Sequence, residues 1–64
     1  MTTKERALSA LMEERGYSTG LIQTALIMLG GRREALDELI DYVAENAATE
    51  DDVIGRMAVL FGTH

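Results

Sequence analysis

Residues 32–47 read RREALDELIDYVAENA, and this stretch decides the fold class. Its apolar side chains recur every three or four positions, which is the spacing of one face of an α-helix. They are Ala35, Leu36, Leu39, Ile40, Tyr42, Val43 and Ala47. The acidic residues between them are Glu34, Asp37, Glu38, Asp41 and Glu45. The stretch therefore predicts an amphipathic helix with one buried face and one solvated acidic face.

Three further segments show helical spacing of apolar residues. Gly16 ends the first predicted helix, and Gly30 and Gly31 separate the second from the third. The chain has no proline and no sustained alternation of apolar and polar residues, which a half-buried strand would require. We predict an all-α fold in a single domain over residues 1–64, with a compact three-helix bundle plus a fourth C-terminal helix. The predicted helices cover about 3–15, 19–29, 32–47 and 50–61.

Local signals support the starts of these helices. Thr2 followed by Glu5 is the pattern of a capping box, and Ser18 and Thr49 are residues suited to an N-cap. Three acidic residues at 50–52 favour the start of the last helix, because the helix dipole attracts negative charge there. The predicted core includes Leu26, Leu36, Leu39 and Val43.

The amino-acid composition disfavours several classes of function. The 64 residues carry 6 Lys and Arg against 11 Asp and Glu, a formal net charge of −5. This balance disfavours nucleic acid as a partner, because such binding draws on contacts between cations and phosphate. The chain has no cysteine and one histidine, His64 at the last position, so it lacks the usual nucleophile–base pair and metal-ligand sets. We expect no enzyme activity, no catalytic residue, no metal and no cofactor.

The same survey bears on location. No apolar run approaches the ~18–20 residues that cross a bilayer. The N-terminal MTTKER lacks the basic-then-apolar layout of a secretory signal. We expect a cytoplasmic protein with no membrane partner.

Glycine and arginine adjoin at one predicted turn. Gly30 and Gly31 precede Arg32 and Arg33 at a helix start, which is a corner that favours anions. A phosphate-binding loop also needs a preceding strand and a longer glycine pattern, and both are missing. We interpret the segment as a helix–helix turn whose arginines pair with acids elsewhere.

The chain has more apolar residues than a chain of this length can bury. Ile27 lies on the polar side of its helix, and Val59 does the same on the last helix. Tyr17 follows Gly16 in a turn, where it is either a core aromatic that closes the corner or a half-exposed contact residue. Methionines add adaptable surface. The candidate partner-binding residues are Gly16, Tyr17, Ile27, Tyr42, Met57, Val59 and Phe61.

From residue 11 to residue 43 the order of residues resembles a ubiquitin-associated (UBA) domain. These are compact three-helix domains with a Met-Gly-Phe/Tyr loop after the first helix, an Ala-Leu pair in the second and a Gly-Gly or Gly-Asn turn before the third. The matching residues here are Leu11, Met12, Gly16, Tyr17, Ser18, Ala25, Leu26, Gly30, Gly31, Glu34 and Ala35. The resemblance implies a UBA-like core over about 3–47 with an added helix over about 50–62.

The resemblance implies a small non-enzymatic protein–protein interaction module. Ubiquitin-binding members have a large apolar residue before the loop glycine and a dileucine-like end of the third helix. This chain has Arg15 at the first place, and Ile40 and Asp41 at the second, so we expect no strong binding of ubiquitin. The N-terminal domain of elongation factor Ts has a similar outline and binds ribosome-associated factors, so the outline leaves the partner open.

Two alternatives stay open. One is a homodimer of structural or regulatory role in which helices 19–29 and 50–61 pack across a two-fold axis. The other is a ribosome- or nucleic-acid-associated domain that binds through Arg6, Arg15, Arg32 and Arg33.

The apolar face of the last predicted helix has to pack against another surface, because an isolated helix of ~12 residues is marginal in water. It either packs on the first three helices, with Phe61 buried, or crosses to a second copy of the chain. We favour the second arrangement, in which Val53, Met57 and Phe61 contact a partner subunit, and a homodimer over a foreign partner.

Overall fold

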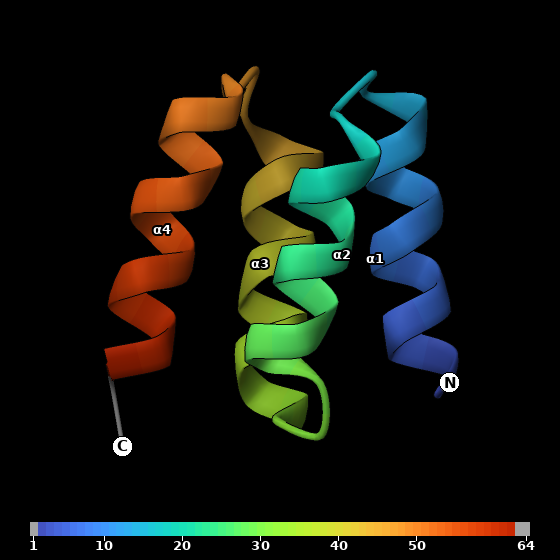
Figure 1. Cartoon of the computed structure of the whole chain (residues 1–64), viewed down its shortest axis with the longest axis vertical. Helices are drawn as coiled ribbons and strands as arrows, with labels where there is room; N and C mark the ends of the chain where they lie inside the picture. Colours follow the sequence, from blue (N-terminus) through green and yellow to red (C-terminus); the bar gives the residue numbers. More distant parts are fainter. Residues whose placement is uncertain (1, 63–64) are drawn as a thin grey trace.

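The computed structural model of this chain describes residues 2–62 and shows four helices with no strand among them (Figure 1). The all-α prediction is confirmed. The helices are α1 (Thr3–Glu14), α2 (Thr19–Leu29), α3 (Arg33–Glu45) and α4 (Glu50–Gly62). The predicted ends differ by one or two residues at most. The largest difference is that α3 stops at Glu45, which leaves Ala47 outside it and exposed.

Side-chain caps start three of the helices. Thr2 and Glu5 form the predicted capping box: the Thr2 hydroxyl accepts from the Glu5 N–H, and the Glu5 carboxylate accepts from the Thr2 N–H at 2.8 Å. Ser18 caps α2 through the Leu21 N–H. A second reciprocal pair starts α4, where Thr49 and Asp52 each accept from the other's backbone N–H. Hydrogen bonds from the backbone and hydroxyl of Thr2 also lower the pKa of Glu5.

Glycine ends α1 as predicted. Gly16 has φ +83°, a left-handed conformation that glycine adopts at little cost. The Gly16 N–H donates to the Glu13 carbonyl, and the Tyr17 N–H donates to the Met12 carbonyl. This pair of bonds is a Schellman motif, and it reverses the chain toward α2.

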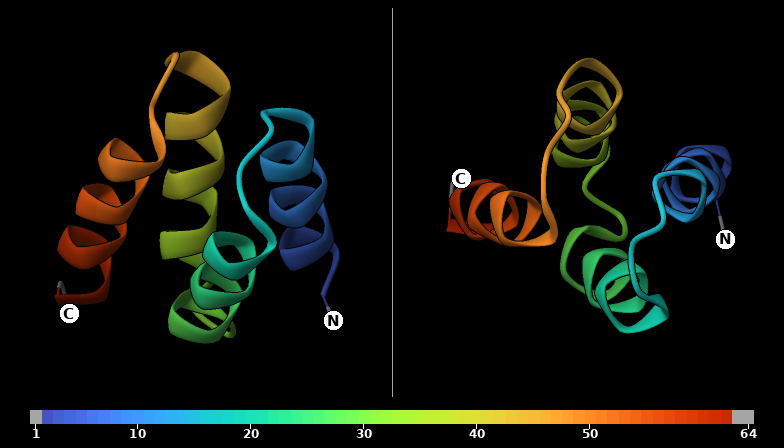
Figure 2. Two further views of the ribbon diagram at one scale, coloured as in Figure 1. Left: turned by 45° about the horizontal axis from the view of Figure 1, so that its top comes forward. Right: turned by 90° about the horizontal axis from the view of Figure 1, so that it is seen from above.

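The helices alternate in direction, so α1 runs parallel to α3, and α2 runs parallel to α4 (Figure 1). Both α1 and α4 pack against α2 and α3, on opposite sides of that central pair (Figure 2). The helix α4 therefore packs within its own chain, on α2 and α3, which fits one of the two predicted arrangements.

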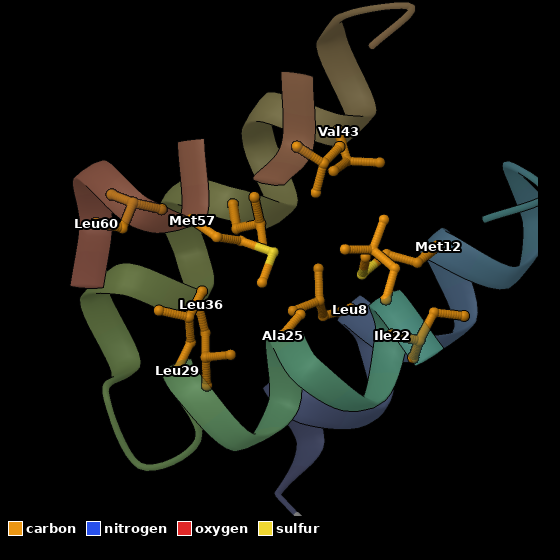
Figure 3. Packing of buried hydrophobic residues seen from close by; sticks show 12 residues of the cluster. Leu8, Met12, Ile22, Ala25, Leu29, Leu36, Val43, Met57 and Leu60 are labelled. Carbon is orange, nitrogen blue, oxygen red and sulfur yellow. The ribbon is translucent and has the colours of Figure 1, made fainter. Parts of the chain in front are cut away.

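The core is apolar throughout and draws on all four helices (Figure 3). Of the predicted core residues, Leu36, Leu39 and Val43 are buried, whereas Leu26 is only partly buried. Leu26 is next to Ala25 on α2 and packs against the edge of the core, so the prediction that it is a core residue holds only in part. The twelve buried residues are Leu8, Met12, Leu21, Ile22, Ala25, Leu29, Leu36, Leu39, Val43, Val53, Met57 and Leu60.

One further expectation was wrong. Val53 and Met57 do not contact a partner subunit, because both are buried in the core of a single chain, 0% and 2% exposed. Together with Leu60 they occupy one face of α4 at spacings of four and three residues, and that face meets α2 and α3. Phe61 is half exposed, so it is not the buried residue that packing within one chain was expected to produce.

Within residues 2–62, every helix is too short or too polar to cross a lipid bilayer.

Candidate protein-interaction surface

A groove runs between the parallel helices α2 and α4, with a volume of about 490 Å³. Met57 and Leu21 lie at its base, 2% and 8% exposed. Glu50, at one end, is the one ionisable residue among those that line it in the described chain. The lining residues are Ser18, Gly20, Leu21, Thr24, Met28, Glu50, Ile54, Met57 and Ala58. The groove is thus a mainly apolar concave surface.

Small side chains keep the groove open. Gly20 and Ala58 present little bulk on its two sides. The Thr24 hydroxyl donates to the Gly20 carbonyl at 2.8 Å, so this polar group is already satisfied within α2. A partner that covers Thr24 would therefore leave no hydroxyl without a hydrogen bond.

Large apolar side chains stand beside the groove. Ile54 and Phe61 are each 50% exposed, and they lie with Ala58 on one face of α4 at spacings of four and three residues. On α2, Ile27 is 82% exposed and lies on the same face as Gly20 and Thr24. We name the set the α2–α4 surface. It consists of Gly20, Thr24, Ile27, Ile54, Ala58 and Phe61.

The two ends of the groove differ in charge. At the end where both helices begin, the Glu50 carboxylate accepts from the Ser18 N–H at 2.9 Å. At the other end, the Arg32 guanidinium donates to the Phe61 carbonyl at 3.0 Å and lies 5.7 Å from the centre of the Phe61 ring. Between them α2 has no charged residue. The groove therefore has a carboxylate at one end, and Arg32 lies beyond its other end, next to Phe61.

Tyr17 lies away from this surface and joins two connecting segments. Its hydroxyl donates to the Ala48 carbonyl at 2.7 Å, and the ring is half-buried against the core. Burial disfavours the phenolate and raises the pKa of Tyr17. These contacts fit the aromatic that closes the corner, one of the two roles that the sequence left open. Gly16 beside it is exposed.

The other predicted contact residues lie in two places. Tyr42 lies on α3 under the guanidinium of Arg56, which is 4.7 Å from its ring centre. Val59 is 59% exposed but lies about 140° round α4 from Ile54, so it faces away from the groove. Met57 lines the groove but is too deeply buried to project from it. Of the seven predicted contact residues, Met57 therefore lines the groove, and Ile27 and Phe61 share helical faces with residues that line it.

Sequence reasoning missed four residues of the surface: Gly20, Thr24, Ile54 and Ala58. The arc of α4 was expected to be buried as a whole, but Ile54 and Ala58 are exposed on its α2 side. For Gly20 and Thr24 a signal was available, because they precede Ile27 by seven and three residues on one helical face.

Two of the arginines named for the nucleic-acid alternative lie far apart. Arg15 donates to the Ala44 carbonyl at 3.1 Å, where α1 and α3 end. Arg32 lies at the opposite end of the molecule, beside the last turn of α4. Lys4 pairs with Asp37 between α1 and α3. Arg15 and Arg32, two of the four arginines that the nucleic-acid alternative relied on, thus lie at opposite ends of the molecule. His64 lies outside the described residues.

Comparison with protein-family models, with curated proteins and with solved structures finds no match. The resemblance to UBA domains rests on residues 11–43 alone and stays a prediction.

Proposed function

We propose that this chain is a cytoplasmic, non-enzymatic protein–protein interaction module of UBA-like type that binds its partner through the α2–α4 surface. One observation carries the proposal: of the four large hydrophobic residues that are exposed in residues 2–62, one lines the groove and two others share a helical face with residues that line it. The first is Ile54, and the other two are Ile27 and Phe61. Scattered exposed apolar residues are ordinary, but a group of them around a groove is typical of an interaction site.

The chemistry of the groove supports binding and gives no support to catalysis. Acid–base or nucleophilic catalysis needs a positioned ionisable pair or an activated nucleophile. Glu50 is exposed and already accepts a backbone hydrogen bond. Thr24 donates within its own helix. Apolar contact is what remains for the surface to offer, and a parallel pair of helices suits a third helix laid along the groove.

The matched pair Ile54→Asp and Val59→Asp tests the surface. Both residues are exposed and lie on α4, so neither change should lower the melting temperature by more than a few degrees. Burying an isoleucine side chain contributes about 1.5–3 kcal/mol, so an aspartate at Ile54 should weaken partner binding at least about tenfold.

The measurement is quantitative mass spectrometry of proteins captured from native cell extract by the parent and by each variant. We expect partners that the parent and Val59→Asp retain and that Ile54→Asp loses. Equal capture by all three chains would refute the assignment of this surface.

Ubiquitin should bind weakly or not at all. In UBA-like binding the patch would include the α1–α2 turn and the end of α3, where this chain has charge. Arg15 is hydrogen-bonded to Ala44, and Asp41 is exposed on α3. Covering either charge with an apolar surface would remove its hydration without supplying a partner. In an NMR titration, we expect only small, non-saturating shifts at Gly16, Tyr17 and Asp41. Saturating shifts at these three residues would contradict the prediction.

A further inference from the structure

We infer that the partner of the α2–α4 surface is a second copy of this chain, packed antiparallel about a two-fold axis, with Ile27 of each chain seated on Gly20 of the other. The inference rests on the proposed function of that surface and names its occupant. It is carried by two kinds of complementarity, one of size and one of charge, which share a single axis.

Size complementarity is found along α2. Ile27 is 82% exposed and projects from the helix. Seven residues earlier on the same face, Gly20 leaves a recess, because a Cβ added there would meet no atom within 4 Å. Its φ is not in the left-handed region, so the backbone does not require glycine there. An apposed side chain that fills the recess accounts for the glycine at this position.

A two-fold axis pairs the projection with the recess. When two copies of α2 lie antiparallel and the axis passes between Gln23 and Thr24, residue 27 of one chain faces residue 20 of the other. Within one chain, Gly20 and Ile27 are about 10 Å apart along α2, which is two helical turns. Because the contact is isologous, it forms twice, once on each side of the axis.

The position of α4 fits the same axis. The hydrogen bond between Ser18 and Glu50 sets the two helix starts at one level, and both helices run in the same direction (Figure 1). Each residue advances both helices by the same rise. Starting from the level of that hydrogen bond, the point between Gln23 and Thr24 on α2 is therefore at the same height as the point between Gly55 and Arg56 on α4. That second point is midway between Glu50 and Phe61 along α4.

Charge complementarity follows from this coincidence. The axis brings the acidic end of one groove, with Glu50 and Asp51, to the end of the other groove where Arg32 lies over Phe61. A parallel pairing would instead set the acidic ends against each other, and like charges in contact disfavour it. The charges therefore select the antiparallel arrangement, while Ile27, Ile54 and Phe61 supply the apolar area.

The test uses two complementary variants, Ile27→Asp and Gly20→Lys. In a homodimer of either variant, both equivalent contacts bury a charge without a partner, so each variant alone should be monomeric. In an equimolar mixture, one contact keeps the parent pairing of Ile27 with Gly20. The other sets the introduced carboxylate against the introduced ammonium. Mixing should therefore restore the dimer, which no partner other than a second chain explains.

The measurement is sedimentation equilibrium over a range of concentrations, with circular dichroism to confirm that each chain is folded. We expect the parent and the control Val59→Asp to approach twice the 7.0 kDa of one chain. Each variant alone should show a dimer dissociation constant raised at least about tenfold, and the mixture should recover most of that loss.

Two outcomes would overturn the inference. A parent that stays at 7.0 kDa at every concentration would exclude a second copy as the occupant. In that case the proposed function would still stand if capture of another protein depended on Ile54. A parent that dimerises while the mixture of variants stays monomeric would show that Ile27 and Gly20 do not pair across the axis.

Discussion

Replacing Leu39 with alanine is expected to lower the free energy of unfolding by about 2–5 kcal/mol. Leu39 is 0% exposed and lies in the middle of α3, which packs against all three other helices. The substitution removes buried apolar atoms and leaves a cavity. A domain of this size is near the lower end of the 5–15 kcal/mol typical of folded proteins, so the loss is a large share of its stability.

The matched control is Leu26→Ala, the same chemical change at a leucine that is only partly buried. It should cost clearly less, because the position already contacts water. Urea and thermal denaturation followed by circular dichroism, at one fixed protein concentration, measure both variants. A Leu39→Ala chain that melts within a few degrees of the parent would contradict the structure.

Deleting residues 49–64 is expected to abolish cooperative unfolding. The helix α4 contributes Val53, Met57 and Leu60 to the core, three of its twelve buried residues. Figure 3 shows Met57 pointing from α4 toward the centre of the cluster, with Leu29 and Leu36 nearby. Without α4, core residues on α2 and α3 would face water. The remaining chain would have too little buried area to offset its conformational entropy.

Far-ultraviolet circular dichroism of the truncated chain should show a loss of helix larger than the removal of α4 alone, and no sharp thermal transition. A full-length Met57→Asp variant should behave similarly, because it buries a charge without a partner. Ile54→Asp, one turn away and half exposed, should keep the parent's melting behaviour. A truncated chain with an unchanged melting temperature would show that α4 adds nothing to the core.

Local features of this fold were predictable because their causes are local. The periodicity of residues 32–47 was sufficient to predict α3, since its apolar residues lie within one arc. The boxes at Thr2 and Thr49 and the turn at Gly16 were predictable because capping involves residues at most a few positions apart. The residue at which α3 ends was harder to predict. The hydrogen bond from Tyr17 to Ala48 reaches across 31 residues and holds the segment that leads away from α3.

Burial was predictable on α3 and only partly on α2 and α4, and the reason is geometric. Helical spacing shows which side chains share a face, but the neighbouring helices decide how much of a wide apolar arc is covered. In α4 the arc includes Ile54 as well as Met57, and α2 and α3 cover only the Met57 side.

The sequence by itself therefore determined the helices, their caps and turns, and the exposure of Ile27, because each depends on residues within a few turns of one another. Only the tertiary structure decided that α4 packs within its own chain, and that Ile54 and Phe61 lie beside a groove edged by Gly20 and Thr24. That groove exists because two helices separated in sequence by α3 run parallel, and their contact depends on how all four helices pack around one core.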